Sequence, residues 1–103
     1  MTPDETTAAG LIDRVEAIRL REPRISPLAA GIVAALSMDI ASDSSSFAKT
    51  FGIAHALVLR EISLMAGPEA LVSILSRDAR TQRTHLALSA SGIALVAAIA
   101  AKT

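Results

Sequence analysis

The side chains with the most chemistry to offer lie between residues 44 and 88. This segment has three acidic side chains against five basic ones, Lys49, Arg60, Arg77, Arg80 and Arg83. The segment therefore carries a local charge of +2, whereas the whole chain is neutral, with ten basic and ten acidic residues. Guanidinium and ammonium groups bind phosphate oxygens, and arginine also binds base edges. The neutral total excludes a strongly basic, purely electrostatic nucleic-acid binder, but it leaves room for a protein with a local cationic surface.

The residues around Gly52 have the spacing of a helix-turn-helix. Ala48 supplies a small residue where two helices would cross, and Gly52, four positions later, suits a left-handed turn. Apolar side chains flank the two at positions that would face a core: Phe47, Phe51, Ile53, Val58 and Ile62. The pattern predicts a short helix over residues 44–51, and a second over about 54–66 that the Gly67-Pro68 pair ends.

The pattern changes after Pro68. Residues 71–75 form a short β-type run, and residues 84–88 alternate apolar Leu86 and Leu88 with His85 and Ala87. The polar residues 77–83 between them fit a hairpin loop, although the loop has neither Gly nor Pro. A continuous helix through Asp78 is the main competing interpretation. Ser89 is a suitable cap for a final apolar helix.

Two further helices are expected before residue 44. Thr2-Pro3-Asp4-Glu5 is a strong helix start, the apolar residues up to Ile18 repeat at helical spacing, and Pro23 ends the helix. Ser26-Pro27 starts another helix that runs to about Ala41 and is apolar on most sides, with Asp39 facing out. A helix of this kind is expected to be central and buried. We expect one domain over residues 1–103, with a helix in 1–24, a core unit in 26–88 and a last helix in 89–103.

Composition excludes several classes of site. The chain has no Cys, so disulfides, thiolate zinc sites and thiol-based sensing are ruled out, and two His are too few for a convincing metal site. No paired carboxylates, nucleophile motif or Gly-rich phosphate loop indicates an enzyme, so we expect no catalytic residue and no cofactor. Charged residues before position 20 argue against a signal peptide, and the apolar run of residues 86–101 is too short for a membrane span. We therefore expect a cytoplasmic protein without a membrane partner.

Residues 26–100 resemble the winged helix of the multiple-antibiotic-resistance-regulator (MarR) family. In that family a Gly-Leu-Val strand leads through an Asp/Arg-rich wing into a Leu-Thr-x-x-Gly helix start. Here Leu71-Val72 follows Ala70 at the first element, Arg77-Asp78-Ala79-Arg80 lies in the wing, and Leu88-Ser89-Ala90-Ser91-Gly92 stands at the last element. The chain departs from the family in its short length, its compact wing and an unusually apolar second helix.

The resemblance implies an α+β, mostly α, winged helix-turn-helix with a small β-hairpin wing and flanking dimerisation helices. It implies a dimeric transcriptional regulator that binds palindromic double-stranded DNA, with a recognition helix in the major groove and the wing at the minor groove. Matched residue by residue, the expected DNA contacts are Ser45, Lys49, His55, Ala56, Arg60, Arg77, Arg80, Gln82 and Arg83. The expected homodimer interface is formed by Leu11, Ile12, Val15, Ile18, Ile93, Val96 and Ile99.

Two alternatives to DNA binding remain open. One is a winged helix used only for protein–protein contact, which the neutral net charge and the apolar residues Ala54, Ala56, Leu57 and Leu59 favour. The other is an all-helical interaction bundle in which residues 68–101 form helices and no wing exists. The sequence does not specify an operator, a small-molecule effector, or the choice between activation and repression.

Overall fold

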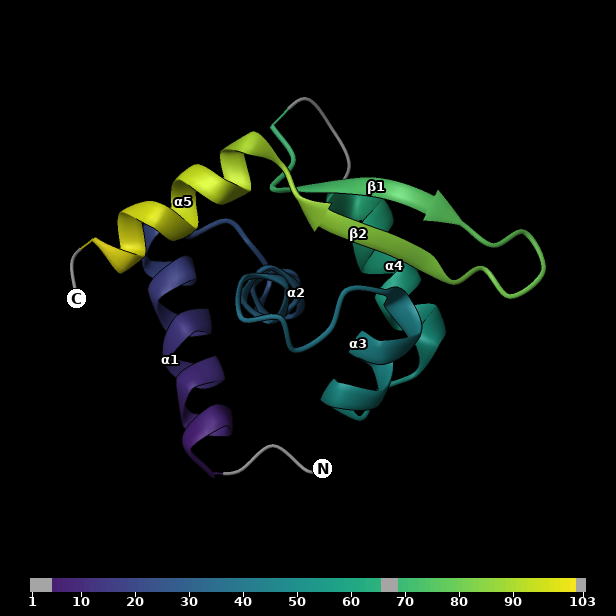
Figure 1. Cartoon of the computed structure of the whole chain (residues 1–103), viewed down its shortest axis with the longest axis horizontal. Coiled ribbons are helices and arrows are strands. Elements are labelled where there is room, and N and C mark those ends of the chain that lie inside the picture. Colours follow the sequence, from purple (N-terminus) through teal and green to yellow (C-terminus); the bar gives the residue numbers. More distant parts are fainter. Residues whose placement is uncertain (1–4, 66–68, 102–103) are drawn as a thin grey trace.

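The computed structural model describes residues 5–65 and 69–101, and in these residues the chain is mostly helical with one small sheet (Figure 1). The elements in order are α1 (Glu5–Arg21), α2 (Pro27–Ser37), α3 (Ser44–Phe51), α4 (His55–Met65), β1 (Val72–Arg77), β2 (Thr84–Leu88) and α5 (Ala90–Ala100). The expected α+β, mostly α class is confirmed. The helix-start residues Thr2-Pro3-Asp4 and the helix-stop pair Gly67-Pro68 lie outside the described residues.

Helix α2 is the centre of the fold, as its apolar sequence predicts. Residues 29–35 are all buried, and Figure 1 shows α2 end-on with the other elements arranged around it. Its start follows the predicted chemistry, because the Ser26 hydroxyl accepts the Ala29 N–H at 3.0 Å and Pro27 occupies the first turn. Burial on every side explains why the helix is built from small and branched apolar residues.

Helix α2 ends at Ser37, four residues before the predicted end near Ala41. Asp39 adopts a left-handed conformation with φ 55°, which breaks the helical path. The Ile40 N–H then bonds to the Ala35 carbonyl at 2.9 Å, and the Asp39 N–H bonds to the Leu36 carbonyl at 3.3 Å. These two bonds form a Schellman cap, a local closure that satisfies the last carbonyls and that apolar periodicity does not reveal. Asp39 is exposed, as expected.

Every other element contributes to the core around α2. Ile18 of α1, Phe47 of α3, Val58 and Ile62 of α4, and Leu86 of β2 are each no more than 2% exposed. Ile99 of α5 joins the same apolar cluster. Burying one such side chain contributes roughly 1.5–3 kcal/mol relative to its exposed state, so the cluster ties helices and hairpin into one body.

Residues 72–88 form an antiparallel β-hairpin, so the continuous helix and the all-helical bundle are both wrong for this segment. Val72 pairs with Leu88 and Arg77 pairs with Thr84, with a bulge between Ile74 and Ser76. The strand predicted over residues 84–88 is observed with the same limits, whereas β1 runs two residues beyond its predicted end. In Figure 1 the loop between the strands projects away from α1 and α5, past α3 and α4.

The hairpin is joined closely to α5. The Ser89 hydroxyl caps the helix by accepting the Gly92 N–H at 3.1 Å, as predicted, and it donates to the Ala70 carbonyl at 2.6 Å. The Ser89 N–H also bonds to the Leu71 carbonyl at 3.0 Å. These contacts position the base of the hairpin against the start of α5.

Candidate functional site

Helices α3 and α4 are joined by a tight turn at Gly52. Gly52 has φ 67° and ψ 36°, the left-handed conformation that the sequence predicts for it. The Ile53 N–H bonds to the Ala48 carbonyl at 3.0 Å and closes the end of α3. Ala48 is 8% exposed, so a small side chain lies where the two helices approach. The local geometry therefore matches the spacing that singled out this segment.

The outer face of α4 is largely apolar. Val58 and Ile62 point into the core, whereas Leu57 is 50% and Leu64 is 69% exposed. Ala56, Arg60 and Ser63 are also exposed and lie on the same helix. Glu61 is half-buried and accepts a hydrogen bond from the Ser26 hydroxyl at the start of α2. Of the two charged side chains on α4, Arg60 is therefore the exposed one and Glu61 the partly buried one.

The hairpin loop is held by its own side chains, which explains how it forms without Gly or Pro. Asp78 Oδ1 accepts the N–H groups of Arg80 at 2.8 Å and Thr81 at 3.1 Å. Gln82 takes the left-handed position with φ 64°, and its amide donates to the Ala79 carbonyl at 3.0 Å. The backbone N–H groups of Thr81 and Arg80 are also the main reason that the pKa of Asp78 lies below its ordinary value.

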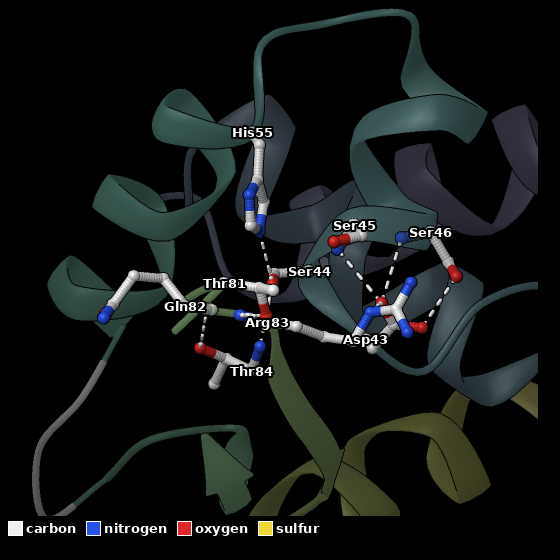
Figure 2. Close-up of polar contacts among 9 residues, drawn as sticks. All are labelled: Asp43, Ser44, Ser45, Ser46, His55, Thr81, Gln82, Arg83 and Thr84. Atoms are coloured by element: carbon white, nitrogen blue, oxygen red, sulfur yellow. Dashed lines mark hydrogen bonds and ion pairs between the residues drawn. The ribbon is translucent and has the colours of Figure 1, made fainter. Parts of the chain in front are cut away.

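Asp43 connects the start of α3 to the hairpin. Its carboxylate accepts the N–H groups of Ser45 and Ser46 at 3.1 and 3.2 Å and the Ser46 hydroxyl at 2.7 Å. Arg83 Nε lies 3.2 Å from Asp43 Oδ2 (Figure 2). Burial acts to raise the pKa of Asp43, but the Ser46 and Ser45 hydrogen bonds and the Arg83 charge outweigh it and lower the pKa below its ordinary value. The ionised carboxylate is thus both a helix cap and an ion-pair partner.

Ser44 lies at the meeting point of α3, α4 and β2. Its Oγ accepts the Thr84 N–H at 2.9 Å and lies 2.7 Å from His55 Nε2 (Figure 2). A serine hydroxyl beside an imidazole is the arrangement of a nucleophile and its base. Ser44 is fully buried, however, so no substrate atom reaches its hydroxyl in this conformation. The contact is better explained as a structural link between three elements.

The structure separates the six basic side chains among the expected DNA contacts into two groups. Lys49, Arg60 and Arg80 are exposed, and among the described residues their side-chain cations have no hydrogen-bond or ion-pair partner. His55 and Arg83 are engaged with Ser44 and Asp43, and Arg77 Nε donates to Thr84 Oγ1 at 3.1 Å. Ala56 is exposed on α4, Ser45 is half-buried in the first turn of α3, and Gln82 closes the hairpin loop.

The expected interface residues on α1 and α5 also divide by exposure. Ile12 and Ile93 are each 58% exposed, while Leu11, Val15 and Val96 are half-buried. Ile18 and Ile99 are 0% and 8% exposed, because α1 and α5 pack those side chains into the core of this subunit. This corrects the expectation for Ile18 and Ile99, whose side chains are not on the surface.

Sequence reasoning missed the contacts that join Asp43 to Arg83 and Ser44 to Thr84. The capping role of Asp43 had a signal, since an acidic residue directly precedes a helix. The burial of Ser44 had none, because it depends on Thr84, which lies 40 residues away in the chain. No local pattern reports a contact of that separation.

An apolar groove of about 600 Å³ lies between α1, α2 and the turn from α3 to α4. Its wall includes Leu11, Ile12, Leu28, Phe51, Ile53 and Leu57.

In the part of the chain that the structure describes, no three His, Cys, Asp or Glu side chains gather as a metal-binding group. No helix in that part is long and apolar enough to span a bilayer. No protein-family model matches the chain, and no curated protein or solved structure does either.

Proposed function

We propose that this chain is a transcriptional regulator that binds double-stranded DNA through a winged helix-turn-helix formed by α3, α4 and the β-hairpin. One observation carries the proposal: a two-helix unit with a left-handed Gly52 turn is followed by a hairpin whose projecting loop bears the unpaired Arg80. The resemblance of residues 26–100 to MarR-type regulators points the same way. A regulator of this kind works in the cytoplasm, with direct access to the chromosome.

In the proposed complex, α4 lies in the major groove and the hairpin loop reaches the adjacent minor groove or its phosphates. Arg60 is the group on α4 best suited to a base edge or a phosphate, and Ala56 offers only a methyl contact to thymine. Lys49 faces the backbone from α3. Because the exposed face of α4 has so few polar groups, phosphate and minor-groove contacts supply most of the affinity.

The proposed regulator is a homodimer built through α1 and α5. Support comes from the exposed apolar side chains of these helices: Ile12 and Ile93 are each 58% exposed, and Leu20 is 83% exposed. Side chains of this size exposed on neighbouring helices are typical of a surface that a partner covers. A two-fold dimer would present two copies of α4 about one DNA turn apart and favour a palindromic site.

Fluorescence anisotropy on labelled genomic fragments over a salt series tests the proposal. Arg80→Ala removes one unpaired cation from the hairpin loop, and we expect weaker binding with a salt-dependence slope that is smaller by about 1. Arg19→Ala is the matched control, because Arg19 is an exposed arginine on α1, and Figure 1 shows α1 on the opposite side of the molecule from the hairpin loop. We expect this control to bind as the wild type does. Binding that is absent, or insensitive to salt, rejects the DNA-binding function.

Protein–protein contact is the second candidate function, and the apolar outer face of α4 favours it. Leu57 is 50% exposed and also borders the apolar groove between α1, α2 and the turn. A surface of this kind suits the apolar face of a partner helix better than a phosphate backbone. The same anisotropy experiment separates the two candidates, since protein contact alone predicts no binding to any fragment even at low salt.

A further inference from the structure

Ser42, Asp43 and Ser44 attach the start of α3 to strand β2 through consecutive contacts. The Ser42 carbonyl accepts the Leu86 N–H at 2.9 Å, and Asp43 forms an isolated antiparallel bridge with His85. Asp43 also pairs with Arg83, and the Ser44 hydroxyl accepts the Thr84 N–H at 2.9 Å. The base of the hairpin loop is therefore fixed to the first turn of α3 on several adjacent residues.

The buried hydroxyl of Ser44 extends this attachment to α4. A serine oxygen has one proton to donate and two lone pairs to accept with, and the Thr84 N–H occupies one lone pair. Among the described residues, His55 Nε2 at 2.7 Å is the only remaining partner for the Ser44 proton. Since a buried hydroxyl proton without an acceptor is costly, the arrangement that satisfies Ser44 is one in which its hydroxyl donates to His55 Nε2.

We propose that Ser44 joins α4 to the hairpin, and that His55 and Arg83 are positioning residues that set the placement of the hairpin relative to α4 instead of contacting DNA. The proposal rests on the DNA-binding function stated above and concerns how that site is held. The Nε2 atom of His55 is hydrogen-bonded to Ser44, and the guanidinium of Arg83 forms an ion pair with Asp43. The DNA is then contacted by the unpaired cations Lys49, Arg60 and Arg80. A wing with a fixed placement loses less conformational freedom on binding than a loose one, which favours affinity.

The contacts of Ser44 with His55 and with Thr84 are called the joint below. A double-mutant cycle on DNA affinity tests this joint. Ser44→Ala and His55→Leu each remove one side of the same hydrogen bond, so we expect each to weaken binding by about tenfold and the double variant to be no weaker than the worse single variant. His55→Gln places a carbonyl oxygen near the position of Nε2, and we expect it to recover most of the affinity. Ser91→Ala is the matched control, because Ser91 is an exposed serine in the first turn of α5 whose hydroxyl has no hydrogen-bond partner among the described residues, and it should bind as the wild type does.

The opposite result has a distinct form. If His55 contacts DNA, Ser44→Ala leaves affinity unchanged, the two losses multiply in the double variant, and His55→Gln fails to recover binding. Any of these overturns the positioning role. Thermal unfolding identifies a variant that does not fold. If Ser44→Ala does not fold, the comparison of His55→Leu with His55→Gln tests the positioning role. His55 is only half-buried, so we expect both of these variants to fold.

A measurement without DNA keeps the joint testable if the proposed function fails. Hydrogen exchange of the Thr84 amide reports directly on the Thr84 N–H bond to Ser44. We expect exchange at least tenfold faster in Ser44→Ala and unchanged in Ser91→Ala. Unchanged exchange in Ser44→Ala refutes the joint itself. Normal acceleration together with a wild type that binds no DNA refutes only the DNA-binding function.

Discussion

Gly92 lies where the start of α5 approaches the segment that leads into β1, and replacing it with alanine should destabilise the fold. A Cβ at this position would lie 2.1 Å from the Leu71 carbonyl oxygen, a backbone atom, and 3.2 Å from Leu88 Cδ2. A separation under 3.0 Å requires something to shift, so the backbone near Leu71 or the first turn of α5 must move by roughly 1 Å. The same Leu71 carbonyl accepts the Ser89 N–H at 3.0 Å, so the movement also weakens that bond.

The expected loss of stability combines two destabilising effects with one stabilising effect. Forcing an extra methyl group into a packed site costs about 1–3 kcal/mol, and weakening the Ser89–Leu71 hydrogen bond costs about 0.5–1.5 kcal/mol. The intrinsic helix preference of alanine over glycine returns about 1 kcal/mol. We therefore expect the free energy of unfolding of Gly92→Ala to fall by about 0.5–3.5 kcal/mol, which lowers Tm by about 4–8 °C for each kcal/mol.

Urea unfolding and thermal melting followed by circular dichroism measure this change. Gly10→Ala is the matched control, because a Cβ at Gly10 in α1 would meet only the flexible end of Met38, at an ordinary 3.4 Å. The same substitution there should raise stability by about 0.5–1 kcal/mol through helix preference alone. A Gly92→Ala protein as stable as the wild type, or one that shifts in the same direction as Gly10→Ala, would refute the steric argument.

Three further predictions concern the ends of the helices and the surface. The lowered pKa of Asp43 means that its ionised form stabilises the fold above its ordinary pKa of 3.8 and that this contribution is lost as pH falls through the lower folded value; urea unfolding across acidic pH should show that decline in the wild type and less of it in Asp43→Asn. Asp39→Gly should raise the free energy of unfolding by about 0.5–1 kcal/mol, because glycine suits φ 55° and a negative charge near the end of α2 is removed; an unchanged urea midpoint would contradict this. Ile93→Glu places a charge on the exposed part of α5, and under the proposed dimer we expect sedimentation to show a dimer for the wild type and a monomer for the variant; equal masses would argue against an interface at this position.

Local chemistry explains which elements were predictable. The turn at Gly52, the caps at Ser26 and Ser89 and the limits of β2 all depend on residues within a few positions of each other, and the structure has them where the sequence places them. The end of α2 was misplaced because the left-handed conformation of Asp39 overrides an apolar pattern that continues to Ala41. The sequence left the hairpin loop ambiguous because its turn is formed without Gly or Pro. Asp78 accepts a backbone N–H within the loop, and Gln82 adopts the left-handed conformation that Gly takes more often.

The sequence by itself determined where helices and strands begin and which faces are apolar, because caps, turns and periodicity act over a few residues. Tertiary structure alone decided which polar side chains are paired within the chain and which are exposed to a partner. Ser44 and Thr84 meet across 40 residues, and Asp43 reaches Arg83 across a similar separation, so neither partner can be read from its neighbours. For that reason His55 and Arg83, which the sequence suggests as contact residues, are paired with Ser44 and Asp43 in the structure, while Arg60 and Arg80 are exposed and available to a partner.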